Sequence, residues 1–166
     1  SFMYANQLWV SDITYLKVNQ KWAYLFLITD AVSHKIVGYH LSKRMDALSA
    51  VMALKMALKN ENPAKNLIHH SDRGIQYCSH SYTNILHKKS VKISMTQSGS
   101  PYDNAIAERI NGILKHELIY PFGDMNTMMD AEIRVNNAIM KYNKMRLHQS
   151  VNYQTPYSVH QNCQLI

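Results

Sequence analysis

Residues 8–41 read LWVSDITYLKVNQKWAYLFLITDAVSHKIVGYHL, and this stretch decides the fold. It contains three runs rich in β-branched and aromatic residues, at positions 8–16, 22–29 and 36–41, and each run is typical of a β-strand. Short polar connections separate the runs, so we expect consecutive strands to pair as an antiparallel meander. The second run is almost unbroken in its apolar character, which predicts a strand covered on both faces.

After residue 41 the pattern changes to alternating helices and strands. We predict a helix at 46–59, a strand at 66–70, a helix at 79–89, a strand at 91–95, a helix in the stretch 99–120 and a helix at 127–144. The final twenty residues show no clear periodicity. This order implies one α/β domain over residues 1–166: a mixed five-stranded sheet of three antiparallel and two parallel strands, helices on both faces, and a helical tail at 125–166.

The stretch at 99–118, GSPYDNAIAERINGILKHEL, is typical of a loop that leads into a helix. Loop-forming residues come first, Pro101 among them, and Asp103 or Asn104 can cap the first amides of the helix. Four apolar residues then recur at helical spacing: Ile106, Ile110, Ile113 and Leu118. This apolar stripe predicts the buried face of the helix.

Three carboxylates are placed where they could converge. Asp12 interrupts the first strand, where an ionised carboxylate is costly unless a cation compensates it. Asp72 follows the fourth strand, at the edge where ligands of open α/β sheets bind. At about 100° per residue, Glu108 is almost in line with Lys115, on the side of their helix away from the apolar stripe. If the first and fourth strands are neighbours, the aspartates meet at one edge and the helix can bring Glu108 beside them.

Three carboxylates at close range repel one another and need a counter-charge. Hard divalent cations that prefer oxygen ligands, Mg²⁺ or Mn²⁺, provide it. Each acid also has a purely structural interpretation: Asp12 as a hydrogen-bonded core residue, Asp72 as an Asx-turn residue, and Glu108 as a solvated helix residue. Periodicity and composition alone leave both interpretations open.

The histidines and cysteines near Asp72 do not suggest a zinc site. His69, His70, Cys78 and His80 lie close together along the chain, but their spacing matches no usual zinc pattern. We therefore favour structural roles for these histidines. The chain has 2 cysteines without a C-x-x-C pair, which favours a reducing, intracellular setting.

The chain is basic, with 18 lysines and arginines against 11 aspartates and glutamates and a net charge of +7. This balance favours a polyanionic partner, although solubility alone would also explain it. The longest apolar run is too short to span a membrane, and no signal-peptide pattern opens the chain. We expect a cytoplasmic protein.

Several segments together resemble a known family. They are WVSDITYL around Asp12, HHSDRGIQY around Asp72 and the stretch 99–118 around Glu108, and residues 73–107, which number 35, separate the second and third acids. The tail adds Tyr142, Asn143, Arg146, His148, Ser150, Thr155 and Pro156. These features resemble the DDE signature of insertion-sequence transposases in the retroviral-integrase superfamily, and the resemblance covers nearly the whole chain.

The resemblance implies a ribonuclease-H-like core in which Asp12, Asp72 and Glu108 bind two Mg²⁺ ions, with Mn²⁺ as a substitute. It implies DNA cleavage by water, followed by attack of the freed 3′-hydroxyl on another phosphodiester. The implied partners are transposon-end and target DNA and further copies of the chain, as a homodimer or higher oligomer. The implied location is the bacterial cytoplasm, on the nucleoid when DNA is bound.

The resemblance also implies residues that contact DNA. Lys115 matches the lysine that the family places about two helical turns beyond its glutamate, so we expect it near the scissile phosphate. Further contacts are expected from Arg73, Asn104, Arg146 and His148. A solvated surface cation is the alternative for Arg73, and packing against the core is the alternative for Arg146 and His148.

Two other functions remain open on the sequence. One is a ribonuclease-H-like nuclease or resolvase that only hydrolyses DNA, and the other is a catalytically inactive DNA-binding relic of a transposase. Relatives usually carry a helix-turn-helix segment ahead of the core, and nothing before Leu8 could supply one. We therefore expect recognition of the element's ends to lie outside this chain.

Overall fold

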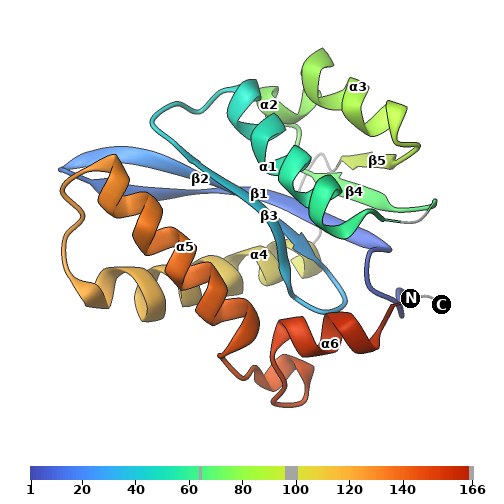
Figure 1. Ribbon diagram of the computed structural model, residues 1–166. Coiled ribbons are helices and arrows are strands. Elements are labelled where there is room, and N and C mark those ends of the chain that lie inside the picture. Colours follow the sequence, from blue (N-terminus) through green and yellow to red (C-terminus); the bar gives the residue numbers. More distant parts are fainter. Residues whose placement is uncertain (64, 96–100, 165–166) are drawn as a thin grey trace.

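Five strands form one mixed sheet between two layers of helices (Figure 1). The computed structural model describes residues 1–63, 65–95 and 101–164, those at 101–104 by their backbone alone. The strands are β1 (Leu8–Val18), β2 (Lys21–Asp30), β3 (Ile36–Ser42), β4 (Ile68–Ser71) and β5 (Lys92–Met95). Their order across the sheet is β3-β2-β1-β4-β5. The first three strands pair antiparallel and β4 and β5 join parallel, which confirms the predicted meander and mixed sheet.

Helices cover both faces of the sheet, as predicted. One face carries α1 (Ala47–Glu61), α2 (Ile75–Cys78) and α3 (His80–Lys88). The other carries α4 (Pro101–Ile113), the π-helix η1 (Leu114–Ile119), the short 3₁₀ helix η2 (Tyr120–Phe122) and α5 (Met128–Lys144). The chain ends with η3 (Gln149–Val151) and α6 (Pro156–Asn162). None of the described helices is long and apolar enough to cross a membrane.

The observed helices differ from the sequence analysis in the following details. The helix after the fifth strand begins at Pro101 rather than after Asp103 or Asn104, because proline has no amide hydrogen to lose and its fixed φ suits a first turn. The same helix changes to π geometry at Leu114. A helix also forms in the final twenty residues, where Thr155 caps the amide of Ser158 ahead of a proline.

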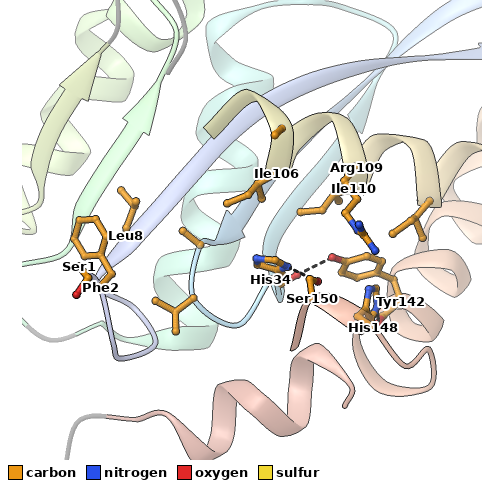
Figure 2. Close-up of a pocket in the computed structure, with 14 residues that line it drawn as sticks. Ser1, Phe2, Leu8, His34, Ile106, Arg109, Ile110, Tyr142, His148 and Ser150 are labelled. Carbon is orange, nitrogen blue, oxygen red and sulfur yellow. Dashed lines mark hydrogen bonds between the residues drawn. The ribbon is translucent and has the colours of Figure 1, made fainter. Parts of the chain in front are cut away.

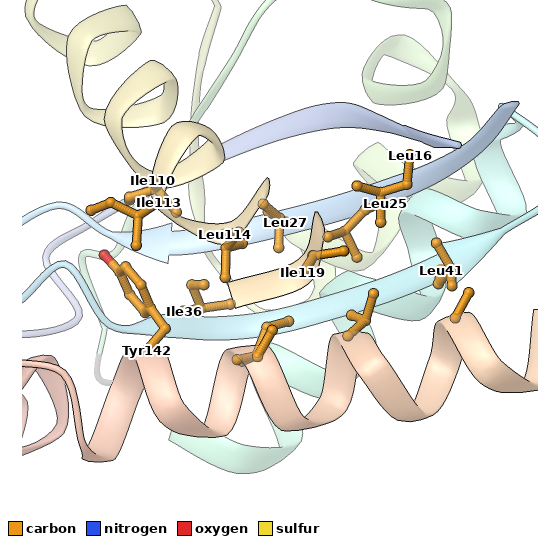
Figure 3. Packing of buried hydrophobic residues seen from close by; sticks show 14 of the residues in the cluster. Leu16, Leu25, Leu27, Ile36, Leu41, Ile110, Ile113, Leu114, Ile119 and Tyr142 are labelled. Carbon is orange, nitrogen blue, oxygen red and sulfur yellow. The ribbon is translucent and has the colours of Figure 1, made fainter. Parts of the chain in front are cut away.

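The core between the sheet and α4, η1 and α5 buries the predicted apolar stripe (Figure 3). Ile106, Ile110 and Ile113 are all buried there, and Leu118 is partly buried. They pack on the strand residues Leu16, Leu25, Leu27, Ile36 and Leu41 and on Tyr142 of α5. This packing fixes the rotation of α4, so that its opposite side faces away from the apolar core.

A buried polar cluster joins α6 to the rest of the fold. His160 is fully buried, with Nε2 at 2.7 Å from Glu61 Oε2 and Nδ1 at 2.8 Å from Ser33 Oγ. Ser33 donates to Asp30, which is also fully buried, and Lys35 pairs with Glu61. Burial opposes protonation of His160, but hydrogen bonds and charges from Asp30 and Glu61 outweigh it and raise its pKa. The cluster therefore balances its buried charges internally.

Candidate active site

Asp12 and Asp72 lie at the same level on neighbouring strands. The strands β1 and β4 are parallel neighbours, and Val10 pairs with His70. Asp12 follows Val10 by two residues and Asp72 follows His70 by two residues, so both acids stand just beyond the paired segment. The condition set by the sequence, that the first and fourth strands be neighbours, is therefore met.

Asp12 is partly buried on the side of the sheet covered by α4. Its Oδ2 accepts a hydrogen bond from Asn111 Nδ2 at 2.9 Å. Burial raises the pKa of Asp12, and the charge of Asp72 raises it further, while Asn111, the amide of Ile13 and the charge of Lys115 lower it without cancelling the rise. The carboxylate therefore stands close enough to both other charged groups for their fields to act on it.

Asp72 is exposed and held by a tight turn. Its Oδ1 accepts a hydrogen bond from the amide of Gly74 at 2.8 Å, which is the geometry of an Asx turn. A Cβ added to Gly74 would lie 2.9 Å from that oxygen and 3.0 Å from Gln76 Oε1. Asp72 therefore forms the Asx turn that its structural interpretation expects, and this turn fixes the direction of its carboxylate.

Replacing Gly74 with alanine should misplace the Asp72 carboxylate without unfolding the protein. The backbone of Gly74 has φ −57° and ψ 148°, which alanine adopts freely, so the substitution acts through the close contacts of the added Cβ with the Asp72 and Gln76 side chains. Because a misplacement of about 1 Å at a reacting centre can cost about 10²-fold in rate, we expect a loss of that order. DNA joining assays beside thermal unfolding measure the two effects. Full activity with an unchanged melting temperature would contradict the prediction.

One side of α4 faces Asp12. Asn111 reaches the Asp12 carboxylate directly, and Lys115 interacts with it electrostatically. Partial burial lowers the pKa of Lys115, and the charge of Asp12 opposes this. Glu108 is exposed and precedes Asn111 by three residues, which places it on the same side of the helix, about 4.5 Å along the axis. The predicted alignment of Glu108 with Lys115 stays a prediction, because the helix changes to π geometry between them.

The structure does not gather Glu108 with the two aspartates. Within residues 1–63, 65–95 and 101–164, no three histidine, cysteine or acidic side chains lie together as a group that could hold a metal ion. The oxygens of Asp12 and Asp72 are nevertheless the hard donors that Mg²⁺ prefers. A divalent cation would also offset the repulsion that raises the pKa of Asp12. The donor chemistry of this pair thus fits such an ion.

The residues expected to contact DNA have different surroundings. Arg73 is exposed beside Asp72, and the side chain of Asn104 lies outside the described part of the chain. Arg146 forms a two-bond ion pair with Glu117, at 2.7 and 2.9 Å, and also contacts His148. His148 is buried, as expected if it packs against the core rather than contacting DNA. DNA contact by the other residues stays a prediction.

A cavity of about 630 Å³ lies on another side of α4 (Figure 2). Its walls combine apolar residues of α4 with His34, Arg109, Tyr142 and His148, and the Tyr142 hydroxyl donates to the carbonyl of His34 at 2.9 Å. Burial lowers the pKa of both histidines, and the charge of Arg109 lowers them further. Neither Asp12 nor Asp72 lines this cavity, so the cavity and the paired acids are separate features.

His69 belongs to a buried hydrogen-bond network beside Asp12. His69 is fully buried, with Nε2 at 2.6 Å from Ser11 Oγ and 2.7 Å from the Tyr82 hydroxyl. Burial lowers its pKa to about 4, so the ring is neutral at pH 7. Ser11 directly precedes Asp12, so this network stiffens β1 beside the acid. The structural role favoured for His69 is the one observed.

Two residues of the site were missed in the sequence. Asn111 carries a usable signal, because it follows Glu108 at helical spacing on the side away from the apolar stripe. Gly74 carries a weaker one, because a glycine in a turn is common and its contact with Asp72 appears only in three dimensions.

Together, the mixed sheet and the paired aspartates define a ribonuclease-H-like core of the integrase type. Residues 4–101 match the family model described as "Integrase core domain", and residues 89–156 match a second model of the same description. The chain belongs to this integrase core domain family.

Curated relatives come from bacterial insertion sequences. The chain is 40% identical over 145 residues to the "Insertion element IS600 uncharacterized 31 kDa protein" of Shigella sonnei, which covers 86% of this chain and 53% of the relative. It is 37% identical over 143 residues to "Transposase InsF for insertion sequence IS3A" of Escherichia coli strain K12, which covers 86% and 50%. The chain therefore spans about half the length of these relatives.

Solved structures share the fold at lower sequence identity. The catalytic core domain of HTLV-2 integrase in complex with magnesium, in its trimeric form, aligns with a TM-score of 0.77 at 18% identity, covering 95% of this chain and 98% of that one. The catalytic core domain of BIV integrase aligns with a TM-score of 0.76 at 20% identity, covering 95% of each. The fold is that of the retroviral integrase catalytic cores.

Proposed function

We propose that this chain catalyses divalent-metal-dependent cleavage and strand transfer of DNA through Asp12, Asp72 and Glu108. The observation that supports this most directly is the placement of Asp12 and Asp72 just beyond the paired ends of β1 and β4, where burial and the charge of Asp72 raise the pKa of Asp12. Two carboxylates kept in mutual repulsion at the edge of a sheet are an unfavourable arrangement unless a function requires it. The transposase relatives support DNA as the substrate.

Asp12 and Asp72 would hold the metal, and Glu108 would complete the site from α4. The HTLV-2 integrase core in complex with magnesium supports this choice of ion. Two bound Mg²⁺ ions would activate the attacking oxygen and stabilise the leaving oxygen at the phosphodiester. Asn111 keeps Asp12 directed toward α4, and the turn at Gly74 keeps the Asp72 carboxylate in place.

Lys115 is proposed to hold a DNA phosphate beside the acids. Replacing it with alanine should weaken DNA binding by about threefold to tenfold and reduce the salt dependence by about one charge, because one phosphate contact is lost. Binding should be measured by fluorescence anisotropy across a salt series, with Mn²⁺ binding followed in parallel. An unchanged salt dependence, or a lost Mn²⁺ signal, would count against this role.

The test of the proposed function is Mn²⁺-dependent cleavage and joining of a pre-branched DNA substrate. The chain is compared with Asp72→Asn and with Asp130→Asn, a matched control that removes an exposed aspartate of α5. Joined product from the chain and the control, but not from Asp72→Asn, would support strand transfer. Hydrolysis without joining would favour the nuclease alternative. DNA binding without any chemistry would favour the inactive relic.

We also propose that the active form is a homodimer or higher oligomer. The HTLV-2 integrase core is described in both dimeric and trimeric forms, which supports association of this fold. Sedimentation velocity over a concentration series, with and without DNA, tests this proposal. A strict monomer under both conditions would contradict it.

A further inference from the structure

The β1–β2 hairpin exposes aromatic side chains on one face of the sheet. Tyr15 is 43% exposed and Trp22 is 57% exposed, while Tyr24 is partly buried beside them. The ring centroids of Tyr15 and Trp22 lie 6.2 Å apart, and those of Tyr15 and Tyr24 lie 5.2 Å apart. Since Tyr15 pairs with Tyr24 and Trp22 pairs with Lys17 across the ladder, the rings form one continuous surface.

One lysine lies over this aromatic surface, and two more lie at the end of the hairpin. Lys17 Nζ lies 6.0 Å from the centroid of the Trp22 ring. Lys21 and Lys43 line, together with Trp22, a hollow of about 360 Å³ at the end of the hairpin, and Lys21 lies toward the α5 side of the sheet because it pairs with the buried Val18. One acid, Asp124, lines the neighbouring hollow that Lys17 and Trp22 share. We call the three aromatic residues and these three lysines the hairpin platform, and its charge is positive.

This combination matches one class of partner. Exposed aromatic rings beside cations bind single-stranded nucleic acids, because unpaired bases stack on the rings while the cations neutralise the backbone. Bases inside a duplex are already stacked on one another and offer only their edges. A protein interface would explain the rings but not the excess of lysines, which are depleted from such interfaces.

The platform also lies close to the acids along the same strand. Tyr15 follows Asp12 by three residues on β1, a distance of about 10 Å along the strand. Asp12 faces α4, whereas Tyr15 and Trp22 face the side of the sheet that α1 covers further along. When DNA is bound at the acids, an unpaired strand of that DNA can therefore run over the end of the hairpin.

We propose that the hairpin platform binds single-stranded DNA by stacking unpaired bases on Trp22 and Tyr15, with Lys17 beside the rings and with Lys21 and Lys43 at the end of the hairpin contacting the phosphates. This rests on the proposed function only in taking DNA as the partner. The site would hold the unpaired strand of a cleaved or branched DNA while the acids act on the adjoining duplex.

Tryptophan fluorescence tests this directly, because the chain has 2 tryptophans and only one is accessible. Trp9 is fully buried, so quenching of tryptophan fluorescence by an unlabelled oligothymidylate of twelve nucleotides reports on Trp22. Anisotropy of the labelled oligonucleotide gives the affinity. Trp22→Ala and Tyr15→Ala should each weaken binding by about 5- to 150-fold, the range for one stacked base, whereas Trp22→Phe should retain most of it.

The matched control is Tyr157→Ala. Tyr157 is an exposed aromatic residue of α6 with Lys35 and Lys144 over its ring, and it lies outside the platform. Its loss should leave the affinity for oligothymidylate unchanged. Circular dichroism of every variant verifies that the fold is retained.

Three results would overturn the proposal. They are unchanged affinity in Trp22→Ala, equal losses in Tyr157→Ala, and binding of a twelve-base-pair duplex that is as tight and as dependent on Trp22 as binding of the single strand. The joining assay separates this outcome from the proposed function. If joining requires Asp72 but the affinity for the single strand does not depend on Trp22, only the hairpin-platform proposal is contradicted. If binding requires Trp22 but no chemistry occurs, the catalytic proposal fails alone.

Discussion

Replacing Asp12 with asparagine should abolish DNA cleavage and joining while making the protein more stable at neutral pH. Asparagine keeps the shape of the side chain but cannot supply a charged oxygen, so we expect a loss of at least about 10³-fold, as for other essential catalytic groups. Stability should rise because burial and the charge of Asp72 disfavour the ionised carboxylate, which is why its pKa is raised.

The pH dependence follows from the direction of that shift. A carboxyl whose pKa is higher in the folded state binds more protons there than in the unfolded chain. The free energy of unfolding of the intact chain should therefore fall as the pH rises from the unperturbed value of 3.8 through the raised pKa. The Asp12→Asn variant should lack this fall.

Denaturant unfolding of both proteins between pH 3.5 and about 8, beside the joining assay, measures the two effects. Added Mn²⁺ should raise the melting temperature of the intact chain and not of the variant, since only the intact site binds it well. Asp130→Asn controls for loss of an exposed negative charge. A variant that joins DNA normally, or that is less stable than the intact chain at pH 7, would contradict the prediction.

Replacing Gly38 with alanine should cost about 3 kcal/mol of stability, at the upper end of the usual range for overpacked cores. Gly38 lies on β3 where α1 crosses it. An added Cβ would stand 2.4 Å from the carbonyl oxygen of Ala53 and 2.7 Å from Ala57 Cβ. Because the first of these is a backbone atom, relief requires the whole helix to move.

The control for this prediction is Gly112→Ala in α4, where an added Cβ meets no atom within 4 Å. Alanine should stabilise that helix by up to about 1 kcal/mol. Urea unfolding of the two variants gives the comparison. If Gly38→Ala loses less than about 0.5 kcal/mol, α1 yields more easily than its packing indicates.

The sheet was predictable because its signals are local. Three apolar runs with short polar connections define the meander, and the alternating pattern that follows leaves few other ways to add two parallel strands. The stripe from Ile106 to Ile113 likewise set the rotation of α4. The change to π geometry at Leu114 was not predictable, because it depends on how η1 and α5 pack rather than on local propensity.

The site was predictable in part. The positions of Asp12 and Asp72 follow from strand order, and strand order follows from topology. The place of Glu108 depends on the distance between α4 and β1, which no spacing in the sequence reports, and the structure leaves it exposed and apart from the aspartates. The burial of His148 depends on how the tail folds over α5, where the sequence shows no periodicity.

The polar cluster around His160 sets a limit on how far the chain can be shortened from its C-terminal side. Removing α6 would take away the imidazole that lies between Asp30 and Glu61, two acids that belong to the sheet and to α1. Burial opposes the ionisation of Glu61, and its pKa is held at about 2 by His160 and Lys35 together. A trimmed protein that ends before Thr155 would keep every strand and each of the three proposed catalytic acids, yet the buried Asp30 would lose His160 and Glu61 would keep Lys35 alone. Biochemical work on this core should therefore keep α6.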